Sequence, residues 1–194
     1  MLQVVDAYWR DLRRKAKLPL RQDLAPAVLD TALPHCFIAE RTTPGVARMR
    51  VAGQALQQHL KLDPRGMPVS TFLDGDGREA LMPLVEAVFQ DPAIVEVRLS
   101  ATSRIGRPRM TGRLLLLPMR DVFEDATRIL GALVTDTSAG LRRTQFRLAD
   151  DPIVRFETVK TPSMPIRVVA TATDVPERDG PATGPALRLV VNNG

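Results

Sequence analysis

Three consecutive segments in the second half of the chain have the pattern of β-strands, and two of them are apolar on both faces. Residues 95–101 alternate between apolar and polar side chains, as in a strand with one buried face. The segments 114–117 and 128–135 instead carry apolar residues at consecutive positions. An antiparallel strand that is buried on both faces needs a layer of structure on each side of its sheet. The chain must therefore supply, or recruit, a cover for the second face.

The N-terminus predicts such a cover. Its apolar residues recur at helical spacing on one face, namely Leu2, Val5, Trp9, Leu12 and Ala16, and Pro19 ends the helix. A partner subunit is the alternative cover, so this amphipathic helix and the sheet face beneath it are also candidates for an interaction surface.

The remaining strands and helices come between these two features. Residues 33–41 and 46–52 flank a turn and predict a hairpin, in which Ala47, Met49 and Val51 point to one face. A short helix is expected over 54–60, and a longer one begins at Asp76 with Glu79 in a capping box. The fold class is therefore α+β, with a five-stranded antiparallel sheet, helices on one face and a leading amphipathic helix.

A length of 194 residues accommodates one domain with an appendage. Residues 1–140 hold all of the patterns above. Residues 141–194 contain six prolines and no periodic apolar face, which predicts a basic, Pro-rich, poorly structured tail with a possible strand at 187–191.

The net charge of +5 raises the alternative of a basic nucleic-acid-binding regulator. Basic residues cluster in residues 1–21 and again at Arg104, Arg107, Arg109 and Arg113. No helix-turn-helix or zinc-finger signature accompanies them, and aromatic residues that could stack on bases are few. A solvated basic surface is the simpler interpretation. The chain has no apolar run long enough to span a membrane, no signal-like start and a single cysteine, which together favour the cytoplasm.

Neither catalysis nor a metal site is expected. His35, His59 and Cys36 are the only histidines and the only cysteine, and their spacing matches no metal motif. None of the serines lies in a Gly-x-Ser-x-Gly context. Cys36 falls in an apolar strand segment, where cysteine usually behaves as a small apolar residue.

The order of these elements, and several short sequences within them, resemble a PAS-domain family known mainly from alphaproteobacteria. The matching sequences span roughly residues 5–140 and are Tyr8-Trp9-Arg10, Leu33-Pro34, Arg50-Val51-Ala52-Gly53, Asp63-Pro64-Arg65-Gly66-Met67-Pro68, Leu114-Leu115-Leu116-Leu117-Pro118 and Ile129-Leu130-Gly131.

The resemblance implies the PAS fold and a sensory or signalling module that binds a small ligand or a partner protein, with no catalytic residues to transfer. Its cofactor is unknown. Haem is disfavoured because the long helix lacks a histidine, and flavin because the Asn-Cys-Arg-Phe-type motif of light-sensing relatives is absent.

Two sets of candidate site residues follow. Between the sheet and the helices, a pocket for a small apolar ligand is expected to be lined by Phe37, Met49, Val51, Phe72, Val85, Met110 and Leu116. On the outer face of the sheet and the leading helix, a homodimer or signalling-partner interface is expected to include Trp9, Leu12, Leu115, Leu117, Leu130 and Val134.

Overall fold

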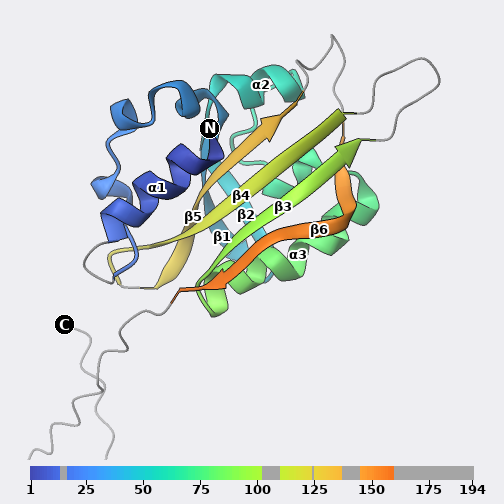
Figure 1. Cartoon of the computed structure of the whole chain (residues 1–194). Helices are drawn as coiled ribbons and strands as arrows, with labels where there is room; N and C mark the ends of the chain where they lie inside the picture. Colours follow the sequence, from blue (N-terminus) through green and yellow to red (C-terminus); the bar gives the residue numbers. More distant parts are fainter. Residues whose placement is uncertain (14–16, 102–109, 124, 137–144, 160–194) are drawn as a thin grey trace, which may run out of the picture. The chain divides into compact units, whose positions relative to one another are not determined.

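The computed structural model describes residues 1–13, 17–101, 110–123, 125–136 and 145–159. Its strands form one sheet in the order β2-β1-β5-β4-β3-β6, and every neighbouring pair is antiparallel (Figure 1). The strands are β1 (Cys36–Thr43), β2 (Val46–Ala52), β3 (Ala93–Ala101), β4 (Met110–Arg120), β5 (Ala126–Thr135) and β6 (Arg147–Thr158). The prediction of an α+β fold with an antiparallel sheet is confirmed, although the sheet has six strands and not five.

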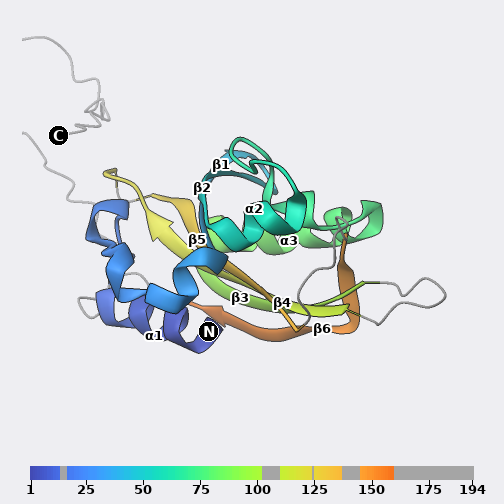
Figure 2. The same ribbon diagram turned by 90° about the horizontal axis from the view of Figure 1, so that it is seen from above.

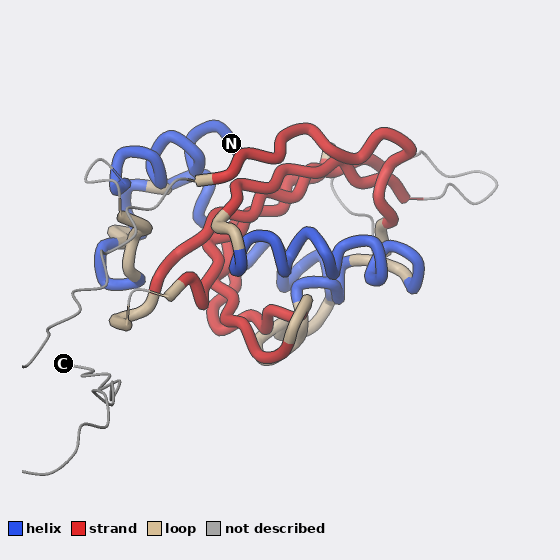
Figure 3. Tube along the Cα trace, turned by 90° about the horizontal axis from the view of Figure 1, so that it is seen from below, coloured by secondary structure: helices blue, strands red, loops and turns tan. Residues whose placement is uncertain are grey.

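Helices lie on both sides of this sheet. On one side are α2 (Gln54–Leu60), α3 (Gly75–Gln90) and the 3₁₀ turn η5 (Val69–Phe72) (Figure 2). On the other side are α1 (Leu2–Leu12) and the turns η2 (Arg21–Asp23), η3 (Pro26–Val28) and η4 (Asp30–His35). The sheet is thus the middle layer of three (Figure 3).

Two separate apolar cores result. The inner core lies between the sheet and α2 and α3, and its buried members include Phe37, Met49, Phe72, Leu81 and Leu116. The outer core lies between the sheet and α1 with its following turns, and it includes Val5, Trp9, Leu115, Leu117 and Leu130. The predicted leading helix is therefore present and supplies the cover that the doubly apolar strands require.

The segment 141–194 was predicted to be poorly structured, and for residues 147–158 that prediction is wrong. These residues form β6, which pairs with β3 from Ala93↔Thr158 to Ser100↔Arg147. Two register shifts, one on each side of Val97, interrupt the pairing. Because bulges break the two-residue alternation, and Pro152 lies between the paired residues Leu148 and Ile153, the sequence pattern of a strand is lost there.

The compact unit consequently extends past the predicted boundary at residue 140 and includes β6. Residues 160–194, with the expected strand at 187–191, lie outside the described residues.

The start of α3 also differs from the prediction. Its N-cap is Asp74, whose side chain accepts a hydrogen bond from the Gly77 backbone N–H at 3.0 Å, and not Asp76. The backbone of Asp74 is fixed by the chain segment before β6, because its N–H donates to the Phe146 carbonyl at 2.7 Å.

Candidate ligand and partner sites

The predicted inner pocket coincides with the inner core. Phe37, Met49, Phe72, Val85 and Leu116 are each at most 2% exposed and belong to one packed cluster, against which Met110 lies partly buried. Phe37 and Phe72 are in ring contact, with centroids 6.4 Å apart. Gly131 makes room for this packing, since a Cβ there would lie 2.0 Å from the Phe37 Cζ. Six of the seven predicted residues are therefore brought together on one face of the sheet.

The seventh predicted pocket residue, Val51, lies on the opposite face. Ile38 pairs with Val51 and the next residue, Ala39, pairs with Met49, so Arg50 is the extra residue of a β-bulge. A bulge shifts the side-chain alternation by one position and turns the following residue to the other face. Val51 is 43% exposed there. Its predicted place in the inner pocket is therefore wrong, because the prediction assumed an unbroken alternation of side chains along β2.

An apolar cavity does exist, but on the outer face of the sheet. It has a volume of about 470 Å³ and lies between β1, β2 and the turns η3 and η4. Val51 lines it beside Ile38 and Cys36 from the strands, while Leu24, Leu29 and Leu33 line it from the turns. Among the described residues that line it, no side chain is charged, and Gln54 contributes the one side-chain amide.

Cys36 lines this cavity with a thiol, a group that can act as a nucleophile, but its environment lowers the reactivity of that thiol. The side chain is buried, and its thiol donates a hydrogen bond to the Ala32 carbonyl at 3.2 Å. Burial raises the pKa of the Cys36 thiol to about 12. The thiol is therefore protonated at neutral pH and contributes to the cavity as a small apolar group.

Most of the predicted interface residues are buried within the chain itself. Trp9, Leu115, Leu117 and Leu130 are at most 2% exposed in the outer core, while Leu12 and Val134 are half-buried. The Trp9 indole N–H also donates to the Pro118 carbonyl at 2.9 Å. In this structure α1 occupies the face that was assigned to a partner, so these residues form an internal contact and not an open surface.

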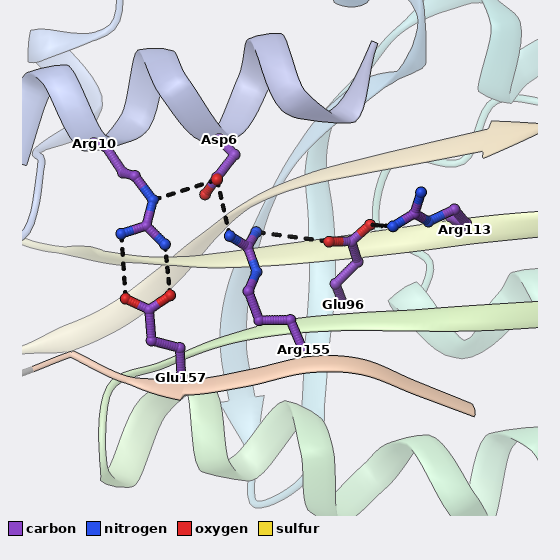
Figure 4. Close-up of polar contacts among 6 residues, drawn as sticks. All are labelled: Asp6, Arg10, Glu96, Arg113, Arg155 and Glu157. Atoms are coloured by element: carbon purple, nitrogen blue, oxygen red, sulfur yellow. Dashed lines mark hydrogen bonds and ion pairs between the residues drawn. The ribbon is translucent and has the colours of Figure 1, made fainter. Parts of the chain in front are cut away.

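A chain of charged residues joins α1 to the sheet beside the outer core (Figure 4). Arg10 of α1 binds Glu157 of β6, with Nη2 and Oε2 2.5 Å apart. Asp6 accepts from Arg10 at 3.3 Å and from Arg155 of β6 at 2.8 Å. The chain continues from Arg155 to Glu96 of β3, and from Glu96 to Arg113 of β4 at 2.5 Å.

The hydrogen bond from Arg10 lowers the pKa of Glu157, and in return the bond to Glu157 raises the pKa of Arg10. This site was missed at the sequence level because two of its members lie in the segment assigned to the tail. Its sequence signals were the spacing of Asp6 and Arg10, four apart on a helix, and that of Arg155 and Glu157, two apart on one strand face.

Several basic residues of the outer face are engaged within the chain. Arg10, Arg113 and Arg155 are engaged in ion pairs on the outer face, and Arg13 lies over the Trp9 ring at 5.8 Å. Arg104, Arg107 and Arg109 of the second basic cluster lie outside the described residues.

The two histidines differ in burial. His59 is buried and stacks on Phe146, with centroids 5.3 Å apart and rings tilted by 11°. His35 is half-buried.

Within the described ranges, no three His, Cys, Asp or Glu side chains are grouped so that they could hold a metal ion. In the same ranges, none of the helices has the length and apolar character required to cross a bilayer.

Comparison with known proteins gives one family match. Residues 2–134 match the family described as "PAS domain". A solved structure reported under the words "Flavin Analogue Sheds Light on Light-Oxygen-Voltage Domain Mechanism" is 17% identical, covers 57% of this chain and 83% of that chain, and has a TM-score of 0.41. A TM-score this low supports no conclusion about flavin. Among curated proteins, none matches the chain.

Proposed function

Because the chain belongs to the PAS domain family, we propose that it is a cytoplasmic, non-catalytic signalling module that binds a partner protein through the outer face of its sheet when α1 moves aside. The simplest partner is a second copy of the chain, because a two-fold axis would bring the same apolar face together from both subunits.

The observation that carries this proposal is the separation of the two apolar cores. Leu115, Leu117 and Leu130 meet α1 and its turns on one side of the sheet, whereas the inner core is closed by α2 and α3 on the other. Displacement of α1 would therefore expose a contiguous apolar face while the inner core remains packed. An exposed apolar face of this kind favours association with another protein.

The charge reversal Arg10→Glu tests the proposal. It would place a third carboxylate beside Asp6 and Glu157 and so weaken the attachment of α1 to β6. We expect discrete dimers, with the dissociation constant for self-association lowered about tenfold or more relative to wild type, which corresponds to about 1.4 kcal/mol. Sedimentation velocity over a range of concentrations measures it.

Arg65→Glu is the matched control, because Arg65 is exposed and pairs with Asp63 in the loop after α2, away from α1. If Arg10→Glu associates no more strongly than Arg65→Glu, the outer face is not a partner site and the proposal is wrong.

A further inference from the structure

We infer that the outer-face cavity is a binding site for one small, uncharged and mostly apolar molecule. This goes beyond the proposed function, since α1 could move and a partner could bind while the cavity stays empty. The inference rests on the backbone contacts that form the walls of the cavity, on the chemistry of the residues that line it and on its contacts with α1.

The walls of the cavity are fixed by the backbone. The bulge at Arg50 turns Val51 outward beside Ile38, which gives the cavity one side. The start of α2 lies against η4, where a Cβ on Gly53 would be 2.2 Å from the Pro34 carbonyl oxygen. The Gly53 N–H donates to the Cys36 carbonyl at 2.8 Å and holds this corner closed. A ligand would therefore enter a hollow that is already formed, without first ordering a loop.

The lining selects the chemistry of the ligand. A volume of about 470 Å³ falls within the ~300–1,000 Å³ typical of small-molecule sites. None of the described residues that line the cavity carries a charged side chain, and the Cys36 thiol is neutral. A charged ligand would lose its hydration without gaining a partner. The exposed amide of Gln54 could meet one polar group of the ligand at the rim.

Apolar side chains at the mouth favour an occupant. Leu33 is 40% exposed and Val51 is 43% exposed, and both line the cavity. Covering them would remove apolar surface from water at roughly 25 cal/mol per Å². A small molecule fits better than a protein segment, because turns bound the hollow on one side and the edge strand β2 bounds it on the other.

The cavity is connected to α1 through its wall. The Ala25 backbone N–H donates to the Tyr8 hydroxyl of α1 at 2.5 Å, and the neighbours of Ala25, Leu24 and Pro26, both line the cavity. Leu130 is shared between the cavity and the outer core that holds Trp9. A ligand in the cavity would thus pack against the turns that follow α1.

Fluorescence titration of the full-length chain with N-phenyl-1-naphthylamine, an uncharged aromatic probe, tests the site. We expect saturable binding of one probe per chain. Val51→Glu should raise the dissociation constant about tenfold or more, because it puts a charge at the cavity wall. Ile153→Glu is the matched control, since Ile153 is 40% exposed on β6 at the other edge of the sheet, and its dissociation constant should stay near that of wild type.

A second measurement uses the wild-type chain alone and does not depend on how the variants fold. Cys36 is the only cysteine, so alkylation by N-ethylmaleimide reports on one side chain in the cavity. Saturating probe should slow this alkylation about fivefold or more, because a ligand that binds and stabilises the native state also reduces opening.

Three results would overturn the inference: no saturable probe binding, equal weakening by Val51→Glu and Ile153→Glu, or an unchanged alkylation rate with probe bound. Dissociation of a wild-type dimer by Val51→Glu, seen by sedimentation, would also overturn it, because a second copy would then occupy the cavity. A negative result with Arg10→Glu would not change any of these four measurements. The proposal of a partner site and the inference of a ligand cavity can therefore be disproved independently.

Discussion

Trp9 is the residue on which the attachment of α1 most depends. Its side chain is fully buried, and its indole N–H reaches the Pro118 carbonyl of β4. Trp9→Ala should lower the free energy of unfolding by about 3–5 kcal/mol, because it removes a large buried ring and leaves a cavity. Urea unfolding followed by circular dichroism measures the change.

Val4→Ala, on the exposed side of the same helix, is the control and should change the free energy of unfolding by no more than about 0.5 kcal/mol. Equal effects of the two substitutions would show that α1 contributes nothing through this face.

Gly131 allows a second prediction at the same scale, this time for the inner core. A methyl group there would overlap the Phe37 ring, which is itself only 1% exposed and has little room to turn. Gly131→Ala should therefore destabilise the fold by about 1–3 kcal/mol, as overpacking does in a filled core. Gly75→Ala is the control, because no atom lies within 4 Å of a Cβ at that position. A melting temperature of Gly131→Ala that equals that of Gly75→Ala would mean that the inner core has spare volume.

The individual residues also show where sequence patterns stop being informative. Burial of Phe37, Met49, Phe72 and Leu116 could be predicted, because each lies at the expected position in its element. The side of the sheet that Val51 faces could not, since a single bulged residue has no distinctive sequence signal. The outer cavity was missed for the same reason: its walls come from a bulge and from consecutive 3₁₀ turns, neither of which has a periodic pattern.

The contact between α1 and β6 adds a pH-dependent contribution to stability. The folded pKa of Glu157 is lowered, so its ion pair with Arg10 stabilises the fold above the unfolded pKa of the carboxyl and is lost as the pH falls through the folded pKa. Glu157→Gln should lower the free energy of unfolding by no more than about 1 kcal/mol at neutral pH, because both partners are partly exposed.

In acid, below the lowered pKa of Glu157, the wild-type chain and Glu157→Gln should have the same stability. Urea unfolding of both proteins at a series of pH values gives the comparison, with Glu79→Gln on the exposed part of α3 as the control. A difference that persists unchanged into strong acid would assign the effect to packing and not to charge.

Among the elements, those with regular periodicity could be predicted and those without it could not. The helix α1 and the strands β3, β4 and β5 appear where the spacing of apolar residues places them. By contrast, β6 is an edge strand with one neighbour, half of its exposed positions are charged, and it contains Pro152. Such residues are typical of edge strands that avoid pairing with other molecules, and in a sequence they look like a loop.

For the whole molecule, the three-layer arrangement follows from the apolar surplus on β4 and β5, which one layer of helices could not bury. The C-terminal boundary of the compact domain, in contrast, could not be predicted from the sequence. Phe146 is fully buried in the inner core and stacks on His59, so the segment before β6 closes that core from outside the region matched by the PAS family. The fold of this chain therefore includes a strand, β6, that lies beyond the residues matched by the PAS family.

Limited proteolysis tests that extended boundary. The backbone of β6 pairs with β3 as far as Thr158, and the Val159 N–H donates to the Pro92 carbonyl at 2.6 Å. Trypsin should therefore spare Arg147 and Arg155, because cleavage requires local unfolding of paired strands. We expect the first cuts in this part of the chain after Lys160 or Arg167, in the Pro-rich sequence that lacks an apolar face. Mass spectrometry of the resistant particle, isolated by gel filtration, identifies its peptides.

In a Phe146→Ala variant, which loses the anchor in the inner core, cleavage at Arg147 should become faster. A wild-type particle that lacks residues 145–159 would place the end of the domain near residue 140 after all.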